Sequence, residues 1–249
     1  MVRILSSINK FTLLAFLFTG LNAMCGLIGI IASIYYSNDL PFLPMQLLIF
    51  GAIFDFLDGR IAKMASVSSA FGAYLDSIGD VITFAILPGI MLLNSPLLGS
   101  EIAGLNLYIA LGVAGFYSLC GWGRLIRFAT RPTDIYFEGL PSPAAALLVG
   151  SSAILAIQHE MTWLFWSNGL PLTFITLITG ILMILTIDYP TPKRGKTPDM
   201  VAIGIAGLIV IIFVILPNTL TLSGILFIAL LYTILGPTMY LKVTSGSKR

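Results

Sequence analysis

Long apolar runs limit the folds that are open to this sequence. The segment from Phe11 to Tyr36 contains no charged residue, and it exceeds the roughly 20 residues that an α-helix needs to cross a bilayer. It is also longer than the apolar core of a signal peptide, about 7–15 residues, so we expect it to remain as the first helix. Of the whole chain, 57% is hydrophobic and 10% is charged, whereas soluble domains carry about 25% charged residues. The sequence therefore predicts an integral membrane protein.

Short breaks divide the chain into eight apolar segments. These cover residues 11–36, 42–64, 69–94, 104–128, 142–158, 163–187, 198–216 and 220–241. Their lengths and composition are typical of membrane helices, and no stretch between them suits a separate soluble domain. We therefore predict an all-α integral membrane protein with about eight transmembrane helices.

The basic residues indicate the orientation. With eight helices and a cytoplasmic N-terminus, every lysine and arginine falls at a cytoplasmic helix end, and the opposite side receives only Asp39, Glu101 and Glu160. Because basic loops stay in the cytoplasm, we expect a multi-pass protein of the cell membrane with both termini cytoplasmic. Residues 1–10 suit an interfacial helix or a frayed basic tail, 11–241 form one transmembrane domain, and 242–249 form a basic cytoplasmic tail. The net charge of +2 follows this distribution and indicates no nucleic-acid partner.

Four aspartates interrupt the apolar pattern. Asp55 and Asp58 are three residues apart and share a face of the second predicted helix, while Asp76 and Asp80 are four apart and share a face of the third. A short cytoplasmic turn makes these helices antiparallel neighbours. At about 1.5 Å per residue, both pairs lie roughly 6–12 Å inward from the cytoplasmic helix ends. We therefore expect the four carboxylates to converge in the cytoplasmic half of the membrane.

These charges need compensation. A buried aspartate costs about 2.5–3.5 kcal/mol at the centre of a membrane helix, and Arg60 and Lys63 are too few to neutralise four acids. Carboxylate oxygens suit hard cations such as Mg²⁺, Mn²⁺ or Ca²⁺, and two divalent ions would balance four charges. The alternative is a set of carboxylates that face a water-filled cavity or cap polar helix ends.

Other catalytic chemistries are excluded or lack support. His159 is the only histidine, which excludes HExxH zinc sites and haem pairs. Cys25 and Cys120 lie singly in apolar segments, where we interpret them as small core residues, because two isolated cysteines form neither a disulfide framework nor a zinc site.

The aspartates belong to a longer pattern with fixed spacing. It reads Asp55-x-x-Asp58-Gly59-x-x-Ala62-Lys63, eight residues, Gly72, three residues, Asp76, three residues, Asp80. This resembles the signature of CDP-alcohol phosphotransferases, D-x-x-D-G-x-x-A-R-x8-G-x3-D-x3-D, with lysine in place of the arginine. The resemblance implies that the predicted transmembrane domain is catalytic and that its four aspartates hold two divalent metals (Mg²⁺ or Mn²⁺). It also implies that Asp80 acts as the catalytic base and that Gly59, Lys63 and Gly72 bind the CDP-lipid.

Several of these positions have a second interpretation. Gly59 and Gly72 also suit close helix packing, and Lys63 also suits a cytoplasmic flank, because lysine lacks the bidentate geometry of arginine. In the first helix, "TGLNAMCG" resembles the family's T-x-x-N-x-x-x-G pattern. Thr19 and Asn22 would then share a face and contact the nucleotide, or they would make polar contacts between helices.

Residues 120–146 carry the information on the acceptor alcohol. Here Arg124 and Arg127 lie three apart on one face at the end of the fourth helix. "RLIRF" followed by "FEGLPSPAAA", and "IDYPTPK" after the sixth helix, resemble the phosphatidylserine and archaetidylserine synthase branch of the family. That resemblance implies transfer from CDP-diacylglycerol or CDP-archaeol to L-serine with release of CMP. An arginine fork suits a carboxylate, so either arginine is a candidate serine ligand; a phosphate ligand or an ordinary basic flank are the alternatives.

Two other functions stay open. The same chemistry would serve another polar alcohol, such as inositol phosphate or glycerol phosphate. A divalent-cation transporter would also use intramembrane carboxylates, although such sites lie near the midplane between repeats, whereas these acids lie off-centre in one hairpin. The loop from Thr130 to Ser142 either covers the acceptor pocket or only connects two helices. Similar enzymes are often homodimers, but no interface can be identified from the sequence.

Overall fold

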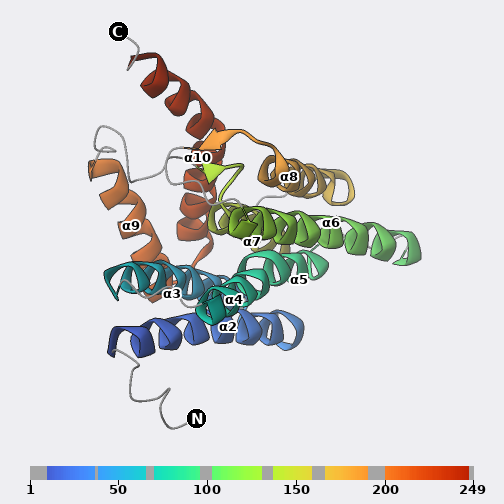
Figure 1. The fold of residues 1–249 in the computed structure, drawn as a ribbon. Coiled ribbons are helices and arrows are strands. Elements are labelled where there is room, and N and C mark those ends of the chain that lie inside the picture. The colour runs from blue at the N-terminus through green and yellow to red at the C-terminus, as the bar shows by residue number, and fades with distance from the viewer. Residues whose placement is uncertain are drawn as a thin grey trace.

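The computed structural model describes residues 10–36, 39–65, 70–95, 103–130, 137–158, 166–189 and 200–246, and nearly all of them are helical (Figure 1). The helical elements are α2 (Lys10–Tyr35), α3 (Leu43–Ala65), α4 (Ala70–Asp80), the π-helix η1 (Val81–Ile86), α5 (Leu87–Leu93), α6 (Ala103–Thr130), α7 (Ser142–Ile157), α8 (Trp166–Ile184), α9 (Met200–Ile215) and α10 (Thr219–Gly246). Two short strands, β1 (Phe137–Glu138) and β2 (Asp188–Tyr189), complete the order. Each predicted apolar segment coincides with one helical rod, the third being α4, η1 and α5 together, so the all-α fold class is confirmed.

The length and composition of the helices are those of a multi-pass membrane protein. Four stretches of the described chain are long and apolar enough to cross a bilayer: Phe11–Tyr35, Gly72–Leu93, Leu107–Phe128 and Thr219–Pro237. Large apolar side chains such as Leu13, Leu119 and Ile234 are exposed on the outer faces of the helices, as lipid contact allows and a water-facing surface does not. The count of eight crossings and the cytoplasmic side of the termini stay predictions.

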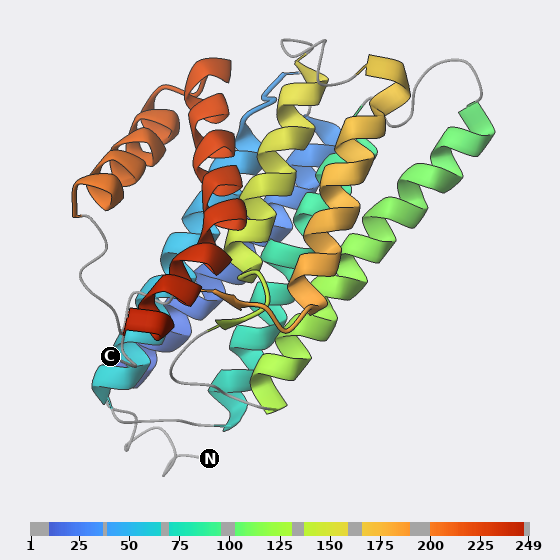
Figure 2. The same ribbon diagram turned by 90° about the horizontal axis from the view of Figure 1, so that it is seen from above.

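The centre of the bundle is α7, which packs against α3, α5, α8 and α10 (Figure 2). Most of its residues are small or aliphatic, and most are buried. Its two central serines do not leave unpaired hydroxyls, because Ser151 and Ser152 donate to the carbonyls of Leu147 and Leu148 in the preceding turn. An apolar helix of small residues therefore lets four neighbours approach closely.

The third rod departs from regular helix geometry where it approaches Pro88. Proline has no N–H, so the carbonyl of Phe84 loses its usual intrahelical donor. The backbone forms the π-helix η1 at this point, and the N–H of Leu87 donates to the carbonyl of Ile82. The carbonyl of Phe84 accepts instead from the hydroxyl of Tyr117 on α6, at 2.9 Å. The carbonyl that Pro88 leaves without its usual donor is thus paired inside the protein, as a membrane span requires. The π-helix follows directly after Asp80.

The two strands connect distant parts of the chain. β1 precedes α7 and β2 follows α8, and they pair antiparallel with Glu138 opposite Asp188. The N–H of Gly139 extends this pairing by donating to the carbonyl of Ile187 at 2.8 Å. The strands lie at the end of the bundle where α6 ends and α7 begins (Figure 2). The strands therefore join the segment that contains "FEGLPSPAAA" to the segment that contains "IDYPTPK".

The chain ends were predicted as separate regions, and the structure covers them only in part. Residues 1–9, which hold most of the predicted interfacial helix, lie outside the described residues. At the other end α10 continues to Gly246, past the expected start of the basic tail at 242. The preceding helix, α9, packs on α10 and is joined to α3 by a hydrogen bond from Gln46 Nε2 to the carbonyl of Val214, at 3.0 Å.

Candidate active site

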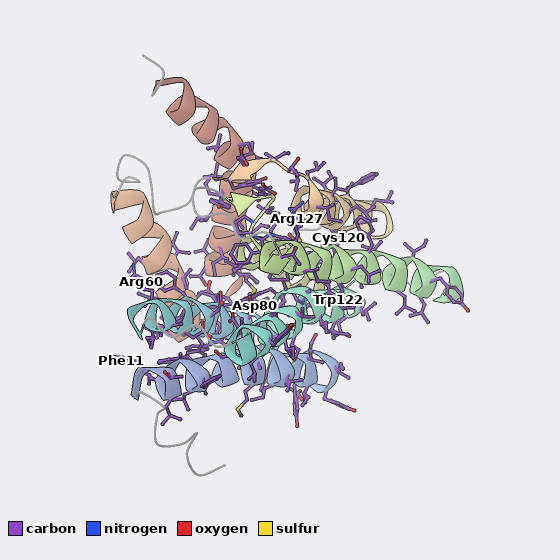
Figure 3. All side chains as sticks on the ribbon, in the orientation of Figure 1. Phe11, Arg60, Asp80, Cys120, Trp122 and Arg127 are labelled. Atoms are coloured by element: carbon purple, nitrogen blue, oxygen red, sulfur yellow. The ribbon has the colours of Figure 1, made fainter. Side chains whose placement is uncertain are left out.

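Three carboxylates, one from α3 and two from α4, meet in the structure. Asp55, Asp76 and Asp80 each contribute one oxygen to a group whose members lie within 4.8 Å of one another. All three side chains are partly buried, and Figure 3 shows Asp80 in the interior of the bundle. The structure therefore brings together three of the four aspartates that the sequence placed at one depth.

The fourth aspartate lies beside this cluster. Asp58 is only 4% exposed, and its Oδ2 accepts a hydrogen bond from the hydroxyl of Thr19 on α2, at 2.8 Å. It remains within electrostatic range of Asp76 and Asp80. One of its oxygens is therefore occupied by the first helix, while the carboxylate still adds charge to the site.

The first helix also holds Asp80. Asn22 is fully buried, and its Nδ2 donates to Oδ1 of Asp80 at 3.0 Å. The hydroxyl of Thr83 in η1 donates to the backbone carbonyl of Asn22, also at 3.0 Å. The site is thus built from α2, α3, α4 and η1. Of these contacts, the sequence predicted that Thr19 and Asn22 share a face, but it missed Thr83.

Two buried acceptors in this site have no partner among the described residues: Oδ1 of Asn22 and Oδ1 of Asp76. Buried polar atoms are nearly always paired, and an orphan costs about 1–3 kcal/mol. Both atoms are oxygens, and oxygen ligands suit hard divalent cations. Arg60 does not serve instead, because it is exposed and its guanidinium lies 4.7 Å from the ring centroid of Phe56. The acidic cluster can therefore hold a metal ion.

Gly59, the glycine that follows Asp58 in the motif, lies in open space. A Cβ built on Gly59 would meet nothing within 4 Å, so helix packing does not require this glycine. By contrast, a Cβ on Gly51, two turns earlier in α3, would lie 2.6 Å from Cγ2 of Thr83 and 3.0 Å from Oδ1 of Asn22. Gly72 lies near the start of α4. Lys63 belongs to the last turn of α3, and its side chain lies outside the described residues.

The first of the two arginines, Arg124, is buried and contacts the start of α7. Arg124 is 6% exposed, and its Nη1 donates to the hydroxyl of Ser142, the first residue of α7, at 2.7 Å. Its Nε has no partner in the described part of the chain. The guanidinium lies within electrostatic range of Asp80 and of Tyr232 on α10. A buried cation with a spare donor therefore lies within electrostatic range of Asp80.

The second arginine has different partners. The guanidinium of Arg127 donates to three backbone carbonyls: Ile184 at 2.5 Å, Glu138 at 3.0 Å and Met183 at 3.1 Å. Figure 3 shows Arg127 on the side of α6 that faces the strands. Spacing alone placed both arginines on one helical face. It did not indicate that Arg124 would keep an unpartnered Nε while backbone carbonyls occupy the guanidinium of Arg127.

Sequence reasoning also missed the contribution of the last helix. Tyr189 of β2 is buried, its ring lies 5.7 Å from that of Tyr232, and its hydroxyl donates to the carbonyl of Thr233 at 3.3 Å. Tyr232 in turn lies within electrostatic range of Arg124. An aromatic residue inside an apolar helix gives no sequence signal of such a contact, because aromatic residues are common in lipid-facing and core positions alike.

The described residues form a helical membrane bundle in which three carboxylates converge and an arginine is buried. Residues 12–187 match the CDP-alcohol phosphatidyltransferase family, and the chain belongs to this family. The helices α9 and α10 lie beyond the matched region.

Three relatives of known name are similar to this chain over about three quarters of its length. CDP-diacylglycerol–serine O-phosphatidyltransferase from Helicobacter pylori is 34% identical over 197 residues, which cover 76% of each chain. A protein of the same name from Methanocaldococcus jannaschii is 32% identical over 184 residues, 74% of this chain and 77% of the relative. Archaetidylserine synthase from Methanothermobacter thermautotrophicus is 31% identical over 187 residues, 74% of this chain and 72% of the relative.

Proposed function

We propose that this protein is a phospholipid-synthesising enzyme that transfers a phosphatidyl-type group from a CDP-linked lipid to L-serine and releases CMP. Family membership and the names of the relatives support this proposal. The structural observation that carries it is the buried guanidinium of Arg124, which has an unpartnered Nε and lies within electrostatic range of the acidic cluster. The donor is CDP-diacylglycerol or CDP-archaeol, because relatives are named for both lipid classes.

The four aspartates are the proposed ligands of two divalent cations, Mg²⁺ or Mn²⁺. The cluster of Asp55, Asp76 and Asp80 and the orphaned Oδ1 of Asp76 fit such a site. Asp58 retains one oxygen that Thr19 does not occupy. When bound, the ions would neutralise the diphosphate and the charge that develops on the departing CMP.

The proposed base is Asp80. Its Oδ1 accepts a hydrogen bond from Nδ2 of Asn22, which orients the carboxylate that would accept the proton of the serine hydroxyl. The serine oxygen forms a bond to the lipid-linked phosphorus, the bond from that phosphorus to CMP breaks, and the hydroxyl proton passes to Asp80. Catalysis of this kind depends on positioning and on charge stabilisation.

The CDP-lipid side of the site is proposed to comprise the residues that the family motif carries. Gly59 has space around its Cα, which would let a phosphate approach the backbone, and Lys63 would add a point charge. Thr19 and Asn22 already hold carboxylates, so we propose that they orient the acids and that Oδ1 of Asn22 is left for the nucleotide. Gly72 is included among the proposed CDP-lipid residues only because it belongs to the family motif.

We propose that Arg124 binds the carboxylate of serine. Its spare Nε suits a carboxylate, which inositol phosphate and glycerol phosphate lack. Arg127 is the weaker candidate of the two, because three backbone carbonyls already occupy its guanidinium. We further propose that this face of the bundle lies in the cytoplasm, on the basis of the lysine and arginine distribution. Lipid tails would then stay in the bilayer while serine arrives from water.

An acceptor assay tests the proposal. The protein in detergent would be incubated with CDP-diacylglycerol or CDP-archaeol, a divalent metal, and serine, inositol phosphate or glycerol phosphate in parallel. We expect CMP release and a new lipid with serine. Release with a phosphorylated alcohol and not with serine would reassign the acceptor, and no release with any acceptor would contradict the enzymatic function.

A further inference from the structure

Arg127 closes the C-terminal end of α8. The last carbonyls of a helix have no intrahelical donor and carry partial negative charge, so a cation placed there is favourable. Here the guanidinium donates to the carbonyls of Met183 and Ile184, the final two residues of α8. The same guanidinium donates to the carbonyl of Glu138 in β1. One side chain of α6 therefore joins the end of α8 to the segment that enters α7.

Gly139 lets the chain pass through this junction. Its φ of +79° is a conformation that side chains rarely adopt. A Cβ there would lie 2.5 Å from the carbonyl oxygen of Met183 and 2.9 Å from Nη2 of Arg127. The next residue continues the attachment, because the N–H of Leu140 donates to the carbonyl of Leu182 at 3.0 Å.

The junction lies immediately before Ser142. That residue begins α7, is 1% exposed, and accepts from Nη1 of Arg124 at 2.7 Å. Arg124 and Arg127 lie nearly one turn apart on α6, so two arginines of one helix hold the same short segment: Arg127 its start and Arg124 its end. The bond to Ser142 uses Nη1 and leaves Nε unpartnered, and so sets the direction in which the spare donor points.

We propose that Arg127 is a positioning residue: it clamps residues 138–140 to the end of α8, which fixes Ser142 and thereby the guanidinium of Arg124. The consequence for catalysis rests on the proposed function, in which Arg124 binds the serine carboxylate. Arg127 itself then touches no substrate. A residue that only supports folding would affect stability without a preference for one substrate, whereas this one affects the acceptor selectively.

Two measurements on the full-length protein in detergent test the clamp. The first is amide hydrogen exchange of residues 137–142, which does not depend on catalysis. Arg127→Ala should lose protection in this segment, and so should Gly139→Ala. Thr130→Ala is the matched control on the same helix: among the described residues its exposed hydroxyl bonds only to carbonyls of α6, so protection should be unchanged. Unchanged protection in Arg127→Ala would overturn the proposal.

The second measurement is steady-state kinetics. Arg127→Ala should raise the KM for serine about tenfold, because a displaced Arg124 would lose its charge-assisted hydrogen bond to the serine carboxylate, with a much smaller change in the KM for the CDP-lipid. Arg127→Lys should recover only part, because lysine keeps the charge and loses the fork. Equal changes in both KM values would overturn the proposal.

A double-mutant cycle locates the effect in Ser142. If Arg127 acts through Ser142, then Arg127→Ala should raise the serine KM less in a Ser142→Ala background than in the wild type. Independent, fully multiplicative effects would overturn the proposed route. The failure of the function itself has a different signature: the wild type would not use serine, while the exchange experiment would still show whether Arg127 clamps the segment.

Discussion

Nδ2 of Asn22 donates to Oδ1 of Asp80 at 3.0 Å and so joins the first helix to the last residue of α4. Thr83, which follows in the π-helix, donates in turn to the backbone carbonyl of Asn22. Asp80 is thus oriented by a residue that is itself held from η1. The orientation of the proposed base therefore depends on three helical elements and not on the aspartate motif alone.

We expect Thr83→Val to lower kcat about fivefold, because it removes one hydrogen bond worth about 1 kcal/mol from the network that orients Asp80. The KM for the CDP-lipid should change little. Thr83→Ser keeps the hydroxyl and should retain most of the activity. Steady-state kinetics of the two variants check this. Equal loss in both would show that the methyl packing of Thr83 matters and its hydroxyl does not.

Removing either Asp55 or Asp76 should abolish activity. The two carboxylates belong to the cluster within 4.8 Å, and alanine at either position would break the proposed metal site. Mn²⁺ binding, followed by electron paramagnetic resonance, should weaken in Asp55→Ala and Asp76→Ala, as should CMP release. Full CMP release by the wild type in excess chelator would contradict the metal requirement.

Two glycines of α3 provide a matched comparison. Gly59→Ala should leave the thermal stability unchanged or slightly higher, because its Cβ meets nothing and alanine is favoured in helices by about 1 kcal/mol. It should nevertheless raise the KM for the CDP-lipid if a phosphate approaches this backbone. Gly51→Ala should instead lower the melting temperature, because its Cβ would lie 2.6 Å from Thr83. An unchanged KM in Gly59→Ala would remove this residue from the proposed substrate site.

Lys63 stands where the family motif has arginine. We expect Lys63→Arg to be tolerated, because it restores the motif residue, and Lys63→Ala to raise the KM for the CDP-lipid through loss of a phosphate contact. The measurement is the apparent affinity for the CDP-lipid in each variant. If alanine leaves that affinity unchanged, Lys63 only flanks the membrane.

Much of the fold could be predicted from the sequence because the bilayer constrains it so strongly. Apolar length predicted the helices, and residue spacing predicted that Asp55, Asp76 and Asp80 would meet. Both depend on local periodicity and on one short hairpin, which a sequence displays directly. The π-helix was not predicted, although Pro88 is visible, because the carbonyl that it frees is paired by Tyr117 from another helix.

The division between the two arginines was also beyond the sequence. Arg124 and Arg127 share a helical face, but their partners lie in residues that are distant along the chain. Arg127 contacts the end of α8, 56 and 57 positions away, and Arg124 contacts the first residue of α7. Such contacts depend on how α6, α7 and α8 pack, which no local pattern encodes.

Kinetics of Arg124→Ala with serine and with serinol test most directly whether Arg124 recognises the carboxylate of serine. We expect the KM for serine to rise roughly ten- to a hundredfold, the effect of losing a charge-assisted hydrogen bond, with a nearly unchanged KM for the CDP-lipid. Serinol has no carboxylate, so it should discriminate poorly between the wild type and the variant. A variant that loses affinity for the CDP-lipid and keeps its affinity for serine would contradict this role and assign Arg124 to the phosphate site.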